Sequence, residues 1–206
     1  MKKTIITLLF ALVTMAGQAQ EQQTIEGRFK MNEESYNDYI PLLKAKGYEA
    51  FSFDLSAIKG KYVTIHFREY VNGKEVEDSP MLLMPYTFET RGDKLIIGTL
   101  PSENDSIAQL CFNLENTLSF GFTLKRKPLF WESENQNVYS YRTIPFELTM
   151  PLDKETFIPL VFYCSFWYDE RDKVTRCCGE NFIAPDLSSD IPKHSPHYYS
   201  IGVIIH

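Results

Sequence analysis

The sequence lacks a hydrophobic run long enough to cross a bilayer as a helix. A membrane-spanning helix needs about 20 consecutive apolar residues. The run from Phe157 to Tyr168 has only twelve residues and contains Pro159. The run from Ile201 to Ile205 is shorter still. We therefore expect no transmembrane anchor.

The apolar segment at the amino terminus is short as well, and its flanks are those of a secretory signal peptide. Met1-Lys2-Lys3 is basic, the segment from Ile5 to Ala16 is apolar, and small residues continue to Ala19. This order of charge, apolar core and small residues is typical of a cleaved export signal. We predict a signal peptide over residues 1–19 and a single domain over residues 20–206. The mature protein is then exported, to the periplasm, the cell surface or the medium.

Positive charge is also scarce. The chain has 21 Lys and Arg against 27 Asp and Glu, which gives a formal net charge of −6. The predicted signal peptide carries two of the lysines and none of the acids, so the mature chain is more acidic still. Nucleic-acid backbones and anionic membranes bind concentrations of Lys and Arg. We therefore expect no nucleic-acid partner.

Motifs for catalysis and metal binding are missing too. Nothing matches a nucleophile elbow or a zinc-protease signature. His194 and His197 are the one close histidine pair, but Pro192 and Pro196 indicate a loop, so we interpret both as solvated loop residues. Adjacent Cys177-Cys178 lack the spacing that lets two thiolates bind one ion. We predict no cofactor and no metal.

What the sequence does contain is a series of short segments rich in aromatic and β-branched residues, separated by turn residues. This pattern is typical of antiparallel strands. We predict an all-β, antiparallel β-sandwich-like domain of about ten strands. A faint similarity between Phe53-Asp54-Leu55-Ser56 and Phe146-Glu147-Leu148-Thr149 leaves two explanations open, two related halves or chance similarity between hairpins.

One short N-terminal helix is expected beside these strands, over Ser35–Lys46. Gly47 follows as a C-cap. Pro41 should either divide this helix or delay its start.

Two hairpins have a register that the sequence itself favours. Asn72-Gly73 favours a two-residue type I′ turn, which places Val71 opposite Lys74 and Arg68 opposite Glu77. In the second hairpin, a three-residue loop at 115–117 joins the strands 108–114 and 118–124. This loop sets Leu114 against Leu118, Phe112 against Phe120 and Leu110 against Phe122, so the apolar faces coincide.

A third hairpin leads to a disulfide prediction. It runs over 158–168, turns at 169–172 and returns from 173 to about 178. With Tyr168 opposite Lys173, Cys164 lies opposite Cys177, at a separation that suits a disulfide. An even count of four cysteines in an exported protein also favours disulfides. We predict Cys164–Cys177, with Cys111–Cys178 as a further pairing; four buried thiols are the alternative.

Trp131 is the best candidate for a ligand-binding residue. An exposed indole among amides and carboxylates suits a pyranose ring, because the C–H face of the sugar stacks on the aromatic ring while its hydroxyls bind the polar groups. We predict a non-catalytic carbohydrate-binding module that binds an extracellular glycan. The alternative is that Trp131 folds back as a loop anchor over the core. The polar residues expected around the indole are Glu132, Glu134, Asn135, Gln136 and Asn137.

Two other functions compete with glycan binding. A protein-interaction or envelope-assembly component would bind an envelope protein through an exposed sheet edge or through the aromatic surface around Trp167 and Tyr168. A glycan-acting hydrolase would use two carboxylates on either side of a sugar, drawn from the acids near the two tryptophans: Glu132, Glu134, Asp169 and Glu170.

Overall fold

The structure is a computed structural model that describes residues 36–79, 86–114, 118–130, 137–177 and 179–206. Residues 37–206 form one compact unit, separate from residues 1–36, and we call it the second unit. The predicted signal peptide lies outside the described residues, so it remains a prediction. Among the described residues, no helix has the length and apolar character needed to span a membrane.

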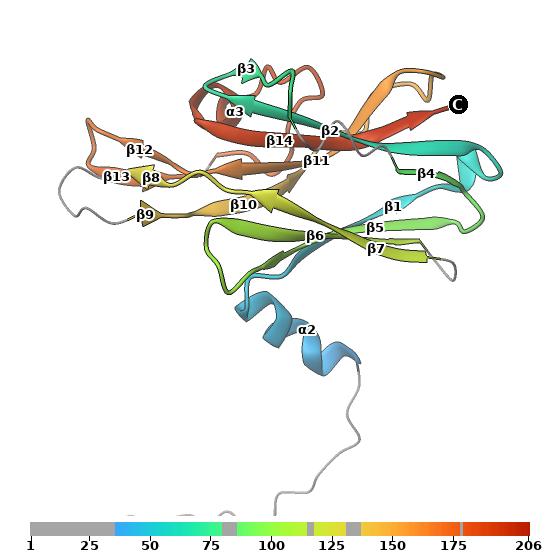
Figure 1. The fold of residues 1–206 in the computed structure, drawn as a ribbon, viewed down its shortest axis with the longest axis horizontal. Coiled ribbons are helices and arrows are strands. Elements are labelled where there is room, and N and C mark those ends of the chain that lie inside the picture. The colour runs from blue at the N-terminus through green and yellow to red at the C-terminus, as the bar shows by residue number, and fades with distance from the viewer. Residues whose placement is uncertain (1–35, 80–85, 115–117, 131–136, 178) are drawn as a thin grey trace, which may run out of the picture. The chain divides into compact units, whose positions relative to one another are not determined.

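The second unit contains a four-stranded antiparallel sheet in the order β1-β5-β6-β7 (Figure 1). The predicted hairpin with facing Phe112 and Phe120 is confirmed, since Leu114 pairs with Leu118 and Leu110 with Phe122. The loop residues 115–117 lie outside the described residues. The strands are β1 (Glu49–Asp54), β5 (Lys94–Pro101), β6 (Ile107–Leu114) and β7 (Leu118–Lys125).

A six-stranded antiparallel sheet faces the first one (Figure 1). Its order is β10-β11-β14-β2-β3, and β4 also pairs with β2. Two facing sheets of four and six strands confirm the predicted β-sandwich of about ten strands. The strands are β10 (Tyr141–Pro145), β11 (Phe157–Ser165), β14 (His197–Ile205), β2 (Tyr62–Val71), β3 (Lys74–Glu75) and β4 (Tyr86–Glu89).

Smaller elements complete the second unit. Two short hairpins pair β8 with β9 and β12 with β13. The two sequences suspected of marking related halves occupy different positions, because Phe53 lies in β1 of the four-stranded sheet and Phe146 follows β10 of the six-stranded sheet. The remaining elements are the 3₁₀-helix η1 (Ser56–Ile58), β8 (Leu129–Phe130), β9 (Asn137–Val138), β12 (Trp167–Asp169), β13 (Val174–Arg176) and the helix α3 (Asp190–His194).

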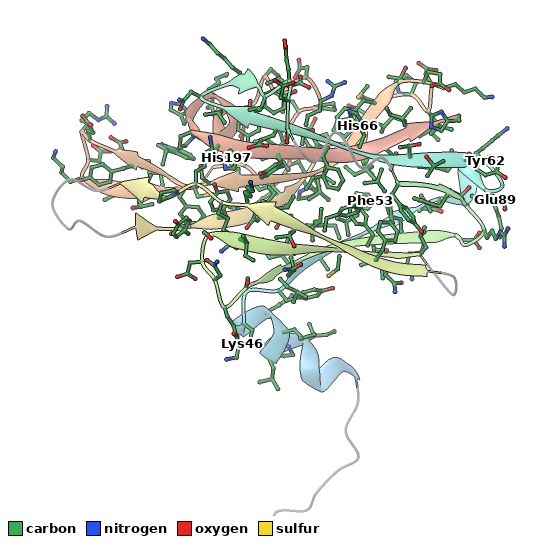
Figure 2. All side chains as sticks on the ribbon, in the orientation of Figure 1. Lys46, Phe53, Tyr62, His66, Glu89 and His197 are labelled. Carbon is green, nitrogen blue, oxygen red and sulfur yellow. The ribbon has the colours of Figure 1, made fainter. Side chains whose placement is uncertain are left out.

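Aromatic side chains fill the space between the two sheets, where Figure 2 shows Phe53. Phe67 of β2 is 1% exposed, and its ring centroid lies 6.2 Å from that of Phe112 and 5.0 Å from that of Phe122. Burying one such side chain contributes about 1.5–3 kcal/mol. Contacts of this kind hold the sheets together.

The six-stranded sheet is covered on both faces. Successive side chains of a strand point to opposite faces, and on β14 Tyr199 packs between the sheets whereas Tyr198 packs in a second cluster of buried side chains. The second cluster includes Cys177, Ile183 and Ile191 from the segment between β13 and β14. This segment explains why the central strands are apolar on both faces.

The first hairpin turns as predicted but is shorter than expected. Val71 pairs with Lys74, and both Asn72 (φ 50°) and Gly73 (φ 73°) adopt the positive φ of a type I′ turn. The ladder ends at the next pair, so the predicted Arg68–Glu77 pairing is wrong. The Arg68 guanidinium instead lies 3.9 Å from the Glu75 carboxylate and covers the Phe157 ring.

The register predicted for the third hairpin is wrong by two residues. Tyr168 pairs with Thr175 rather than with Lys173. The four-residue turn occupies 170–173, one position later than predicted, and Lys173 lies in it with a φ of 56°. Cys164 therefore has Arg142 and Tyr198 as its strand neighbours, not Cys177.

The predicted helix is present as α2 (Tyr36–Ala45), and Gly47 ends it with a φ of 81°. The Gly47 and Tyr48 N–H groups donate to the carbonyls of Lys44 and Leu43, which is the expected C-cap pattern. Pro41 lies inside the helix and does not divide it. Because this short helix is exposed at Ile40 and Leu42, water can satisfy a carbonyl that lacks its N–H partner.

Candidate functional site

Most of the predicted sugar-binding residues lie outside the described residues. These are Trp131, Glu132, Glu134, Asn135 and Gln136. Asn137 is described as the first residue of β9, where it pairs with Phe130 of β8. The predicted site therefore lies on the connection of a short hairpin.

That hairpin and the β12–β13 hairpin leave the same end of the six-stranded sheet (Figure 1). β9 leads into β10, and β12 continues from β11, which is the neighbour of β10 in the sheet. The Phe166 N–H donates to the Ser140 carbonyl at 2.9 Å, which joins the two chains where they leave the sheet. Trp167 begins β12 of the second hairpin, whereas Trp131 lies outside the described residues.

A pocket of about 330 Å³ lies beside the β12–β13 hairpin, and we call it the Trp167 pocket. The Trp167 indole is half-buried and stacks on the His194 imidazole, with ring centroids 5.5 Å apart and planes at 22°. Most of the side chains that line the pocket are charged or titratable. They are Trp167, Asp169, Arg171, Arg176, Glu180, Asp190 and His194, together with Gly179 and Ile191.

Asp169 is held as an ionised carboxylate in this pocket. It accepts hydrogen bonds from the N–H groups of Asp172 and Arg171 and from Arg176 Nε at 2.7 Å. These bonds, led by that from Asp172 N–H, lower the pKa of Asp169. The general acid of a glycosidase has to keep its proton near neutral pH. Asp169 is therefore unsuited to that role.

The other charged side chains of the pocket differ in whether they are already engaged in hydrogen bonds within the protein. Glu180 accepts hydrogen bonds from the N–H groups of Asp190 and Ile191, both at 3.0 Å, and so fixes the start of α3. The Asp190 and Arg171 side chains are 80% and 85% exposed, and within the described part of the chain their ion pairs, with Lys193 and Asp172, lie at the surface. Such pairs are worth about 0–1 kcal/mol, so a ligand can compete for Asp190 and Arg171.

The interpretation of His194 and His197 as solvated loop residues is wrong for His197, which is buried in a strand, whereas His194 is exposed as expected but ends a helix instead of lying in a loop. His194 ends α3, which tolerates Pro192 because the first residues of a helix have no intrahelical partner for their N–H groups. His197 begins β14 and is 1% exposed (Figure 2). The two imidazoles have different partners. His194 stacks on Trp167, whereas His197 contacts Glu69 and Tyr141.

His197 is the centre of a buried hydrogen-bond network. Its Nε2 donates to the Glu69 carboxylate at 3.2 Å, and its Nδ1 lies 2.5 Å from the Tyr141 hydroxyl. Ser79 Oγ donates to the other Glu69 oxygen at 2.6 Å. Burial raises the pKa of Tyr141. Both imidazole nitrogens are therefore used, which leaves neither free to bind a metal or to accept a substrate proton.

No sequence pattern predicts this network. Glu69 and His197 are 128 residues apart, and they meet because β2 and β14 are neighbours in the six-stranded sheet. A hollow of about 230 Å³ lies next to them, lined by His197, Lys127, Ser140 and Ser165 among others.

The network makes stability depend on pH through Glu69. The hydrogen bond from His197, and a further one from Ser79, lower the pKa of Glu69. A depressed pKa gives stability that is present above the ordinary value of about 4.3 and is lost as the pH falls through the lowered value. Glu69→Gln should therefore be less stable than the wild type at pH about 6, and the difference should shrink as the pH falls to about 3. Urea unfolding across this range measures it; parallel curves for the two proteins would contradict the assignment.

Comparisons with known proteins reveal a family but no relative of established activity. No curated protein and no solved structure matches the chain. Residues 18–206 match a family that is described as a domain of unknown function, DUF5041. Since this match covers nearly the whole sequence, the chain belongs to the DUF5041 family.

Proposed function

We propose that this protein is a non-catalytic carbohydrate-binding module that works after export. The observation that carries the proposal is the Trp167 pocket, in which an indole lies among polar side chains, of which Arg171, Asp190 and His194 are exposed. Sugars are bound by this combination, because an aromatic face takes their C–H groups and charged or amide groups take their hydroxyls. Trp131 lies outside the described residues, and its contribution to glycan binding stays a prediction.

The pocket favours binding over hydrolysis. Asp169 is ionised and held by three donors, and Glu180 is used to fix α3. The groups that remain open, Arg171 and Asp190, can donate to and accept from sugar hydroxyls. Hydrogen bonds to charged groups of this kind contribute about 1.5–3 kcal/mol each.

Affinity electrophoresis through gels that contain soluble polysaccharides would identify the ligand. Arg171→Ala should then weaken binding about tenfold or more, because the guanidinium lies in the Trp167 pocket. Arg91→Ala is the matched control, since Arg91 is also exposed and also pairs with a carboxylate, that of Glu89 at 2.8 Å. Equal binding by the two variants would place the ligand elsewhere.

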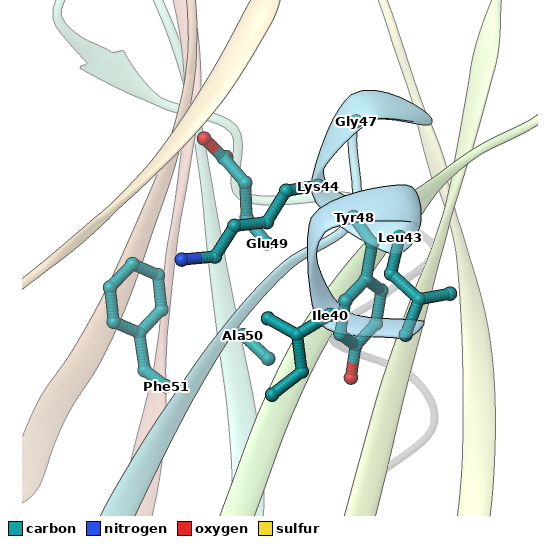
Figure 3. A pocket seen from close by; sticks show the side chains of 8 residues that line it. All are labelled: Ile40, Leu43, Lys44, Gly47, Tyr48, Glu49, Ala50 and Phe51. Atoms are coloured by element: carbon teal, nitrogen blue, oxygen red, sulfur yellow. The ribbon is translucent and has the colours of Figure 1, made fainter. Parts of the chain in front are cut away.

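A second candidate is a protein-interaction or envelope-assembly component, and a specific feature favours it. β1 is an edge strand, and apolar hollows lie along it. One, of about 590 Å³, includes Leu148 and Phe182, which are 64% and 55% exposed. Another, of about 630 Å³, lies between α2 and β1, where Figure 3 shows Ile40, Leu43 and Tyr48 grouped together. An extended partner segment can add to such an edge.

The same binding experiments distinguish the glycan-binding module from the protein-interaction component. Glycan binding predicts retention by at least one polysaccharide. Failure with a broad panel, together with a stable protein partner co-purified from the native envelope, would favour the second candidate.

A further inference from the structure

Cys164 and Cys177 are buried thiols whose side chains interact. They are 0% and 3% exposed and belong to the same cluster. Each thiol is among the causes that shift the pKa of the other, as expected for neighbouring side chains in one buried cluster. The two residues thus meet even though their predicted register is wrong.

Arg142 explains how they meet. It pairs with Cys164 across β10 and β11, and its Nη1 donates to the Cys177 carbonyl at 3.0 Å. The chain leaves the β11 ladder at Phe166, so the β12–β13 hairpin is free to return Cys177 over Cys164. Arg142 therefore holds the returning chain in place beside Cys164.

The two thiols differ in acidity. The neighbouring Cys164 thiol lowers the pKa of Cys177, and the Arg142 charge adds to this effect. Burial raises the pKa of Cys164. Cys177 is therefore the thiol that ionises first and attacks an oxidant.

The other described cysteine is not a competitor for Cys164. Cys111 lies on β6 of the four-stranded sheet, next to Tyr48. Cys178 lies outside the described residues, so its predicted pairing with Cys111 stays a prediction, and the experiment has to separate Cys178 from Cys177.

We propose that Cys164 and Cys177 form a disulfide by exchange with a disulfide oxidant, and that this bond closes the loop that carries Trp167, Asp169 and Arg171. The Cys177 thiolate attacks one sulfur of the oxidant, and the other leaves as a thiolate. Cys164 then loses its proton, and its sulfur attacks Cys177 in the mixed disulfide, which releases the second thiolate. Two electrons pass to the oxidant, and the two protons from the protein thiols complete its two new thiols.

Peptide mapping tests the proposal. The full chain is equilibrated with oxidised or reduced glutathione, unfolded, alkylated and digested with trypsin. Cys164 lies in the peptide 155–171, and Cys177 and Cys178 lie in the peptide 177–193. In the oxidised sample these peptides should be joined, and alkylation should be lost at two of the four cysteines.

Variants assign the bond. Cys178→Ser and Cys111→Ser should keep the joined peptides, and Cys177→Ser should lose them. Oxidation should also raise the midpoint of thermal unfolding of Cys178→Ser by about 5–10 °C. Alkylated Cys164 in the oxidised wild type, or no joined peptides in oxidised Cys178→Ser, would overturn the proposal. The peptide map of Cys178→Ser shows whether Cys164 is bonded to Cys177 even if the Cys177→Ser variant does not fold.

Discussion

Replacing Gly202 by Ala should lower the free energy of unfolding by about 3 kcal/mol or more. Gly202 lies in β14 opposite Pro159, where the β11 ladder shifts its register. A Cβ atom at Gly202 would lie 2.1 Å from the Ile158 carbonyl oxygen and 2.8 Å from its carbonyl carbon. Relief would require backbone movement, and β14 is paired on its other side with β2 along its whole length.

Urea unfolding measures this loss, and Gly121→Ala is the matched control. Gly121 also lies in a strand, but a Cβ there would have its nearest neighbour, the Leu110 carbonyl oxygen, at 3.4 Å. We expect Gly121→Ala to change stability by less than about 1 kcal/mol. Equal stability of the two variants would mean that β11 and β14 do not approach as closely as described.

Replacing Phe112 by Ala should have the second large effect, a loss of about 3–5 kcal/mol. Phe112 is 1% exposed. Its ring stacks on Phe120 with centroids 5.2 Å apart and meets Phe122 edge-on at 5.8 Å. Truncation removes these contacts and leaves a cavity between the two sheets, which close-packed neighbours fill only in part.

Ser52→Ala is the control for this change. Ser52 belongs to the same sheet but is exposed, so its truncation should change stability by less than about 0.5 kcal/mol. A loss below about 1 kcal/mol for Phe112→Ala would show that this ring does not join the sheets.

The sequence predicted the parts of the fold that are set locally. In the first hairpin, Asn72 and Gly73 both tolerate positive φ, so the turn type follows from the residues themselves. In the second, the alternation of apolar residues excludes a two-residue loop, which would set apolar residues against polar ones, and favours the three-residue loop. The register predicted for the third hairpin is wrong because Lys173 adopts a positive φ in the turn. Lysine is not a residue type that favours positive φ, so the sequence does not reveal this turn.

The candidate site was harder to predict, because long-range contacts form it. Glu69 and His197 meet only through the pairing of β2 with β14. Cys164 and Cys177 meet through Arg142, which no turn rule identifies. Asp169 lies close to Trp167 in the sequence. The hydrogen-bond donors that stabilise its ionised form, however, come from its own turn and from Arg176.

Tryptophan fluorescence during glycan titration tests glycan binding most directly, because the chain has only two tryptophans, Trp131 and Trp167. Trp131→Phe leaves Trp167 as the one reporter, and Trp167→Phe leaves Trp131. We predict a saturable change in the wild type and at least tenfold weaker binding by Trp131→Ala, with unchanged stability. No saturable change across a broad panel of glycans, or unchanged affinity in Trp131→Ala and Trp167→Phe alike, would contradict carbohydrate binding at these two hairpins.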